Sequence, residues 1–481
     1  MPRTLVVWIL VASAHIASSA TAPQPAIEVR LRTHLTSYAS RPGSPFECVV
    51  IRPFDVNGQL VLPQGTIIHG TVRRATRVGL GLIRDRASLE LSFQDYQTPD
   101  GHRLALNARL ASIDNAREQV TSKGRIKGVV GAGNPNQFIF GVWARPSLGI
   151  FYRSLIGLTG ASNQLWAKFE LGPLGAVALL GLRCAIFTFP EPEIHLPPGT
   201  DMKLIATTPI PRDPSVARVS TPAADELSDA ISGWIEKEPY ATEKPSGRAA
   251  DDIVNVAFLG SREELQEAFS VAGWSIADPE TMRNVSRVYS AFNAMRDYAG
   301  APVSSLLYDG AQPDLVFEKS LDTISKRHHV RIWRAGVLDG QDIWLGAATH
   351  DTGISFNLHT VKFTHKIDRS VDVERAKIAT DLTFAGCAQP ANLVERSAAA
   401  SAGPDDAIVT DGAVAVLQLQ PCAHSIALSD SPAPKPPGNR VSRLTRRIVL
   451  EARDYILREN LYYWSYQAFR HRHADQPAAS N

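Results

Sequence analysis

Apolar and polar residues alternate along most of residues 27–117, which is the pattern of half-buried β-strands. The alternating segments are IEVRLRTHL, FECVVIRPF, TIIHGTVRRA, ASLELSFQDY and HRLALNARLAS. Asp100-Gly101 stands between two of these segments and predicts a tight hairpin. The segment LPQGTIIHGTV recurs in weaker form as LPPGTDMKLIA at residues 196–206, so we expect the later copy to add a last strand. The pattern predicts an all-β, barrel-like domain over residues 27–210.

A glycine-rich insertion interrupts this pattern at residues 124–192. Its spaced glycines are typical of helices that approach each other closely, as in membrane pairs. Arg145, Arg153 and Arg183 break its apolar runs, so none of them is a clean membrane span. Two interpretations stay open: a loop packed on the barrel, and a hairpin that contacts a membrane or another copy.

Residues 211–250 are rich in Pro, Asp, Glu, Lys and Ser, which predicts a linker that carries one short helix over residues 224–236. A second domain is predicted over residues 251–425. It begins with an apolar strand at residues 253–259. Ser261 and Glu264 then form a capping-box pattern that predicts the start of a helix. The chain as a whole is therefore expected to have an α+β fold.

The C-terminal part combines a Pro-rich spacer, residues 429–438, with an amphipathic helix, residues 439–473. Apolar residues recur there at three- and four-residue spacing: Val441, Leu444, Ile448, Ala452 and Tyr455. The arginines and aromatic residues of this segment suit an anionic membrane surface. The alternative is a helix that docks on its own protein and turns an arginine-rich face to solvent.

Length and charge limit the class of protein. The chain has 481 residues and a net charge of +2, so two domains are expected and no basic field indicates nucleic-acid binding. Residues 1–22 combine Arg3, a short apolar core and small residues at a cleavage site, as a secretory signal does. We therefore expect a secreted or periplasmic protein, either free or associated with a membrane.

Export makes the four cysteines candidates for disulfide bonds. Cys387 and Cys422 lie in the same predicted domain and are the favoured pair. Cys48 and Cys184 form a second candidate pair, but spacing alone does not decide it.

Several motifs in order carry a family resemblance over residues 251–422. They are DDIVNVAFLGSREELQEAFSVAGW, DLVFEK, RHHVRIWR, WLGAATHDTGI, THKID and VDVER, and they resemble the LssY C-terminal domain family. The resemblance implies an α+β domain and brings no catalytic residues with it. A weaker resemblance, carried by LVLPQGTIIHGTV, is to the β-barrel domain of channel subunits of type IV secretion systems.

Histidines and carboxylates gather in the segment from residue 313 to residue 375. HHVRIWR and DIWLGAAT are strand-like, and Asp339-Gly340 between them predicts a two-residue hairpin turn. That turn would place His329 opposite His350 and His328 opposite Asp351. A third strand, TVKFTH, ends in His365 and leads to Asp368.

Imidazoles beside a carboxylate suit a divalent transition metal, so His328, His329, His350, His365 and Asp368 are candidate ligands. His350 and Asp351 are candidate catalytic residues, as a general base and the group that orients it. This set depends on the strand register, because a slip of one residue exchanges the faces. The alternative is that Asp368, Ser370 or Asp372 caps the next helix and that the histidines form only local hydrogen bonds.

These patterns favour a non-catalytic protein of the cell envelope that binds another envelope protein, a lipid headgroup or a glycan. The alternative is a hydrolase for a lipid or phosphate ester that uses the histidine–carboxylate cluster. Convergence of these side chains around an open pocket would favour the hydrolase. Separated and hydrogen-bonded histidines would favour the binding protein.

Overall fold

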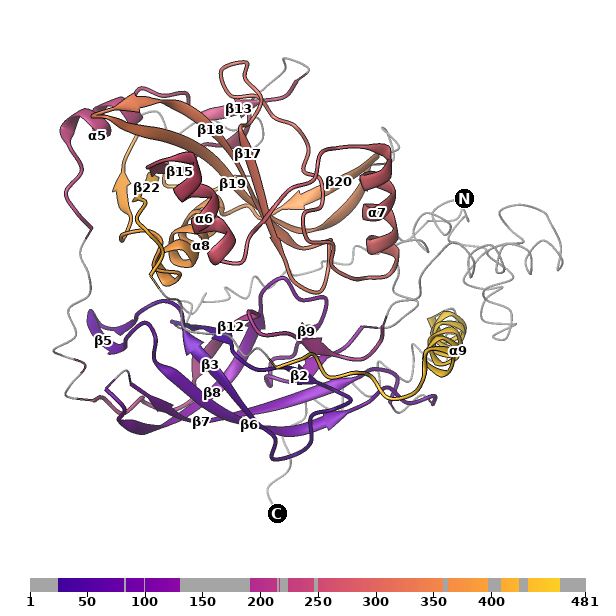
Figure 1. The fold of residues 1–481 in the computed structure, drawn as a ribbon. Helices are drawn as coiled ribbons and strands as arrows, with labels where there is room; N and C mark the ends of the chain where they lie inside the picture. Colours follow the sequence, from indigo (N-terminus) through magenta and orange to yellow (C-terminus); the bar gives the residue numbers. More distant parts are fainter. Residues whose placement is uncertain are drawn as a thin grey trace, which may run out of the picture.

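The computed structural model describes residues 25–81, 84–98, 100–129, 191–213, 216, 224–245, 250–357, 362–396, 408–423 and 431–458. The predicted signal, residues 1–22, and nearly all of the insertion 124–192 lie outside these ranges. The described chain forms a β-barrel, a mixed α/β domain stacked on it, and a helix beside the barrel (Figure 1). The predicted α+β class is confirmed.

The barrel is built from the strands of the N-terminal part and closes on itself. The hydrogen-bonded order is β6-β3-β1-β12-β8-β7, and β7 pairs with β6 again. Their bounds are β1 Ile27–Leu31, β3 Pro45–Val50, β6 Ile67–Thr76, β7 Ser88–Gln97, β8 Arg103–Ile113 and β12 Asp201–Ala206. Shorter strands are β2 Leu35–Thr36, β4 Phe54–Val56, β5 Gln59–Leu62, β9 Gln119–Val120, β10 Ile126–Lys127 and β11 His195–Leu196.

The weak repeat in the sequence corresponds to the closing strand. β12, which carries the second copy, pairs with β1 on one side and β8 on the other, as the pattern predicted. Inside the barrel, Phe46 packs edge-on against Phe93, with ring centroids 5.5 Å apart. Gly70 leaves room for Phe46, because a Cβ at this position would lie 2.3 Å from the ring. Alternation along the strands thus fills the barrel with apolar side chains.

The second domain is organised around a sheet in the order β16-β17-β18-β19-β15-β22-β21, with β20 paired to β19. The strands of this sheet are β15 Val256–Leu259, β16 Ser275–Ile276, β17 Leu315–Ser320, β18 Arg327–Leu338, β19 Gln341–Asn357, β20 Lys362–Ile367, β21 Asn392–Val394 and β22 Val414–Gln418. β13 Ala241–Glu243 and β14 Ala250–Ile253 form a separate two-stranded sheet. The helices of the second domain are α5 Asp229–Ile235, α6 Arg262–Val271, α7 Met282–Asn293 and α8 Val371–Phe384. β15 and β22 are parallel, and the other pairs of this sheet are antiparallel.

Helices cover both faces of this sheet. α6 and α8 bury apolar side chains such as Phe269 and Leu382 against one face. α5 packs Ile231 and Ile235 against the other. The predicted capping box forms at α6: the Ser261 side chain accepts from the Glu264 amide, and the Glu264 carboxylate accepts from the Ser261 amide. Both α5 and β13 lie inside the segment 211–250 that the composition marked as a linker.

A disulfide joins Cys387 and Cys422. This pairing was the favoured one in the sequence and is confirmed. Cys48 is fully buried in the barrel core, and its alternative partner Cys184 lies outside the described residues.

Helix α9, Arg440–Arg458, lies beside the barrel (Figure 1). Arg446, Arg447 and Arg453 hydrogen-bond to residues of the N-terminal domain, whereas Arg440 is exposed. Arg446 donates to the Val78 carbonyl at 2.6 Å, and Arg447 donates to Glu191 at 2.9 Å. Leu450 joins the barrel core, whereas Val441 is 73% exposed. The helix thus docks on its own protein, which is one of the two interpretations that the sequence left open. Its arginine face differs from that interpretation, because Arg446 and Arg447 are half-buried and pair with acceptors of the N-terminal domain. None of the helices in the described part of the chain is both long and apolar enough to cross a membrane.

Candidate functional site

The β18–β19 hairpin has the expected turn but not the expected register. Asp339 and Gly340 form the turn with φ angles of 51° and 78°, as tight hairpins of this type require. A β-bulge between Arg334 and Gly336 then shifts the pairing by one residue. As a result His328 lies opposite His350, and the expectation that His329 would do so is wrong.

This shift divides the predicted site between the two faces of the sheet. His328 and His350 share one face, where their rings stack with centroids 4.3 Å apart. On the other face, His329 Nε2 lies 2.6 Å from Thr349 Oγ1, and Asp351 accepts from Arg327 Nε at 3.2 Å. His350 and Asp351, the predicted catalytic pair, therefore point in opposite directions.

The third strand leads to Asp368, which lies near His350, and places His365 farther along the sheet. The Asp368 carboxylate lies 4.0 Å from His350 Nδ1, and the Asp368 amide donates to the His350 carbonyl. His365 of β20 pairs with Ile354 of β19, which is three residues beyond Asp351. The side chain of His365 is outside the described part of the chain. Asp368 also accepts from the Ser370 amide, just before α8.

His328 is held by carboxylates at both ring nitrogens. Its Nδ1 lies 2.6 Å from Glu374 of α8, and its Nε2 lies 2.9 Å from Asp114, which follows β8 of the barrel. Burial alone lowers the pKa of His328, but the two carboxylates outweigh it and raise the pKa to about 10. At neutral pH both nitrogens therefore donate, and His328 is an imidazolium that links the two domains.

His350 is in the opposite state. Its Nε2 lies 3.2 Å from Asn115 Oδ1, again a residue of the barrel. Burial and the neighbouring His328 lower the pKa of His350 to about 4. His350 is thus a neutral imidazole at neutral pH, with a lone pair on one nitrogen.

A group of charged side chains continues this contact between the domains. We call it the interdomain charge cluster: Arg30, Asp201, Lys319, Lys377 and Asp381. Arg30 donates to Asp201 and to Asp381, each at 2.7 Å, and Lys319 donates to Asp381 at 2.8 Å. Trp274 adds an indole N–H to Asp381 at 3.0 Å. Lys377 also lies 3.9 Å from Asp114, which connects the cluster to His328.

Burial shifts the ionisation of this cluster. The pKa of Lys319 falls to about 8, mainly because the side chain is buried and secondly because the positive charge of Arg30 is near. The carboxylates of Asp381 and Asp201 act in the opposite direction but are weaker. Burial alone would raise the pKa of Asp381, but Lys319, Lys377 and Arg30 lower it well below its usual range. Its carboxylate is therefore charged throughout the physiological range.

No spacing along the chain identifies these residues. Arg30 and Asp201 come from paired barrel strands, and Lys319 and Asp381 come from distant parts of the second domain. The one local signal is Lys377 and Asp381, four residues apart on the buried side of α8, since buried charges require partners. Asp114 lies in a turn directly after β8, and no motif in the sequence marks it as a partner of His328.

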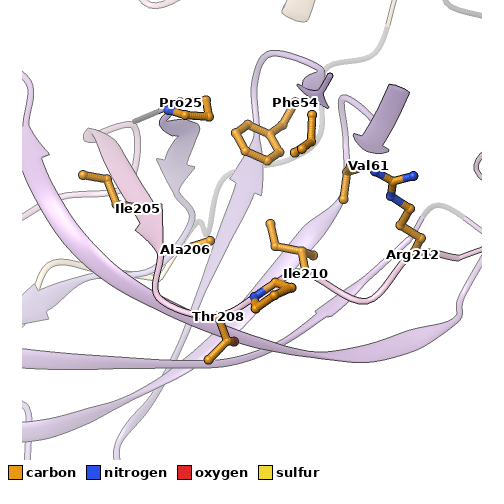
Figure 2. Close-up of a pocket in the computed structure, with 10 residues that line it drawn as sticks. Pro25, Phe54, Val61, Ile205, Ala206, Thr208, Ile210 and Arg212 are labelled. Atoms are coloured by element: carbon orange, nitrogen blue, oxygen red, sulfur yellow. The ribbon is translucent and has the colours of Figure 1, made fainter. Parts of the chain in front are cut away.

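A cavity of about 350 Å³ lies elsewhere, at one end of the barrel. Figure 2 shows the residues around it, mostly apolar, with Phe54, Val61 and Ile210 among them. Arg212 is the charged side chain of its lining and hydrogen-bonds Gln59. None of the predicted site residues lines this cavity.

Comparison with known proteins assigns one part of the chain. Residues 235–414 match the family model described as the LssY C-terminus. The resemblance seen in the sequence is thereby confirmed, and the match begins at the end of α5, inside the segment marked as a linker. No curated protein matches the chain.

Among solved structures, one match is ComB10 of the Com type IV secretion system of Helicobacter pylori. It is 10% identical, and the match covers 40% of this chain and 90% of that chain with a TM-score of 0.20. A likeness at this level carries no argument about the present chain.

Proposed function

We propose that this chain is a non-catalytic scaffold protein of the cell envelope, in which the LssY-like domain is fixed on the barrel. The observation that carries the proposal is the interdomain charge cluster together with His328. These buried side chains form hydrogen bonds with one another across the boundary between the two domains. Breaking such contacts would leave buried charges without partners, so the two domains act as one rigid body.

The arrangement argues against the hydrolase that the sequence left open. A general base needs an orienting carboxylate within hydrogen-bond reach and a place for substrate. His350 and Asp351 lie on opposite faces of the sheet, and His328 already holds two carboxylates. The cavity of Figure 2 lies on the barrel and contains neither histidine.

The envelope location is supported by the disulfide and by the predicted signal. Cys387 and Cys422 are bonded, and such bonds persist in oxidising compartments such as the periplasm. The partners expected from the sequence, namely an envelope protein, a lipid headgroup or a glycan, belong to this proposal.

Cell fractionation of the full chain, with a C-terminal tag, tests the location. We expect the tagged chain in the envelope or periplasmic fraction, with Cys387 and Cys422 protected from thiol reagents until a reductant is added. A chain found in the cytoplasm with both thiols reactive would overturn the envelope proposal.

The absence of catalysis needs its own test. The purified chain is assayed on chromogenic phosphate and carboxylic esters and on phosphatidic acid vesicles, beside His350→Ala. We expect equal background rates for both proteins. Turnover by the wild type that His350→Ala abolishes would establish the hydrolase instead.

A further inference from the structure

We propose that Asp114, His328 and His350 bind a divalent transition metal of the zinc class, which cross-links the barrel and the LssY-like domain. One ligand atom from each of these side chains lies within 4.8 Å of the other two. Asp114 comes from the barrel, and both histidines come from the second domain. The site therefore differs from the predicted ligand set, which took all its members from one hairpin and its neighbour.

The donor types and their spacing fit zinc. Neutral imidazole nitrogens and a carboxylate oxygen are ligands that zinc prefers, at about 2.0–2.2 Å from the ion. His328 Nε2 and Asp114 Oδ2 are 2.9 Å apart, close to the separation of about 3.3 Å between two ligands of one tetrahedral ion. The side chains of Asp114 and His350 are 26% and 18% exposed, so this edge has room to adjust and gives an ion access from solvent.

Glu374 supplies the support that a metal-binding histidine needs. It holds His328 Nδ1 at 2.6 Å, which fixes the ring and directs Nε2 towards Asp114. Carboxylate–histidine pairs of this kind orient the ring and increase its basicity as a ligand. The second oxygen of Glu374 is buried and accepts no hydrogen bond from the described residues. One carboxylate oxygen beside His328 therefore lacks a hydrogen-bond donor among the described residues.

The surrounding charges permit a cation here. Two carboxyl groups, of Asp114 and Glu374, lie against His328, and Asp368 lies 4.0 Å from His350. Burial alone would raise the pKa of Asp114, but nearby His328 and Lys377 lower it, whereas burial raises the pKa of Glu374. The positive charge of Lys377 disfavours a cation at this position, because its ammonium lies 3.9 Å from the Asp114 carboxylate. That ammonium is already paired with Asp201 and Asp381, so part of its charge is neutralised. Metal binding at His328 Nε2 would release to solvent the proton that this nitrogen donates to Asp114, while Nδ1 keeps its proton and its hydrogen bond to Glu374.

The test measures metal on the full chain. The purified protein is stripped with a chelator, titrated with Zn²⁺, and freed of loosely held ion before elemental analysis; Co²⁺ serves as the spectroscopic substitute. We expect about one ion per chain and an absorption band of tetrahedral Co²⁺. The thermal midpoint should rise with Zn²⁺, because a ligand that binds the folded state stabilises it.

Variants then assign the ion to these residues. His350→Ala should abolish stoichiometric uptake, and Glu374→Gln should weaken the affinity by about 10- to 100-fold. His69→Ala is the matched control, because His69 forms a histidine–carboxylate pair with Asp95 on the barrel, at 2.8 Å. Its uptake should equal that of the wild type. Circular dichroism on each variant confirms that a loss of metal is not a loss of fold.

Two results would overturn the site. One is a folded wild type that retains no Zn²⁺, Co²⁺, Ni²⁺ or Mn²⁺ and shows no shift of the thermal midpoint with any of them. The other is uptake that folded His350→Ala retains in full. A bound ion without ester hydrolysis would support both this site and the scaffold proposal. Hydrolysis by the metal-loaded protein would overturn the scaffold proposal alone.

Discussion

Arg30 and Asp381 are 351 positions apart in the sequence, yet Arg30 Nη2 lies 2.7 Å from Asp381 Oδ1. Arg30 belongs to strand β1 of the barrel, and Asp381 belongs to helix α8 of the second domain. Both side chains are buried. Asp381 also accepts hydrogen bonds from Lys319 and Trp274 of its own domain. One carboxylate thus accepts hydrogen bonds from side chains of both domains.

Replacing Asp381 should therefore be costly. In Asp381→Ala, the cations Arg30 and Lys319 lose their shared partner while they remain buried. Removing one member of a buried ion pair typically destabilises a protein by about 3–5 kcal/mol. Urea unfolding should show a large decrease of the midpoint, or the domains should separate before they unfold, visible as a second transition.

Asp342→Ala is the control for that experiment. Asp342 pairs with Arg334 at 2.6 Å, but their side chains are 28% and 50% exposed. Exposed pairs contribute about 1 kcal/mol or less. Equal effects of the two substitutions would show that the buried cluster does not hold the domains together.

The disulfide should contribute in a different way, through the unfolded chain. It joins residues 35 positions apart, and closing a loop of this length stabilises a protein by about 3–4 kcal/mol in the chain-entropy model. Cys387→Ser with Cys422→Ser should lower the unfolding midpoint by a matching amount. A reductant should lower the unfolding midpoint of the wild type to that of the double variant. It should leave the midpoint of the double variant unchanged. A wild type that keeps its midpoint when fully reduced would contradict this.

Stability should also depend on pH through Glu318, a buried residue of β17. Burial raises the pKa of Glu318 from 4.5 to about 7, against the opposing effects of Arg327 and of the Gly300 and Ala301 amides. The folded protein thus holds this proton more tightly than the unfolded chain does. The resulting stability is complete below pH 4.5 and is lost as the pH rises through about 7.

Glu318→Gln removes this titration and keeps the shape of the side chain. The difference in unfolding free energy between wild type and Glu318→Gln should change by about 3 kcal/mol between about pH 4.5 and pH 8, with the wild type losing stability. Denaturant titrations at the two pH values measure it. A difference that is constant with pH would show that Glu318 titrates normally.

The sequence predicted the architecture well because the barrel and the sheet depend on local patterns. Alternation located the barrel strands, and a weak repeat located β12, which closes the barrel against β1 and β8. The hairpin turn at Asp339-Gly340 was also correct. Each of these features is encoded in a few neighbouring residues.

The site was harder to predict because it depends on one unpaired residue and on distant contacts. The bulge at Ala335 moves every pair beyond it by one position, so His328 replaces His329 opposite His350. Nothing in the alternation of RHHVRIWRAG marks that residue. Asp114 reaches His328 across 214 positions, through the packing of two domains, and no motif spacing records such a contact.

Helix α9 shows the same limit and gives the last prediction. Its periodicity was correct, yet its apolar stripe does not face the barrel: Leu444 is 52% exposed and Ile448 is 38% exposed. Docking depends instead on arginines that reach barrel carbonyls and carboxylates, with Leu450, 1% exposed, as the apolar contact. Leu450→Ala should therefore cost about 2–4 kcal/mol, as the loss of a buried leucine does.

Val441→Ala is the matched control, on the same helix but 73% exposed, and should change stability by about 0.5 kcal/mol or less. Urea unfolding gives the midpoints, and limited proteolysis shows whether α9 has left the barrel. We expect Leu450→Ala alone to make α9 sensitive to protease, because its release exposes the helix backbone. If Val441→Ala had the larger effect, the apolar stripe and not the arginine face would be the one that holds α9, and the orientation of the helix described above would be wrong.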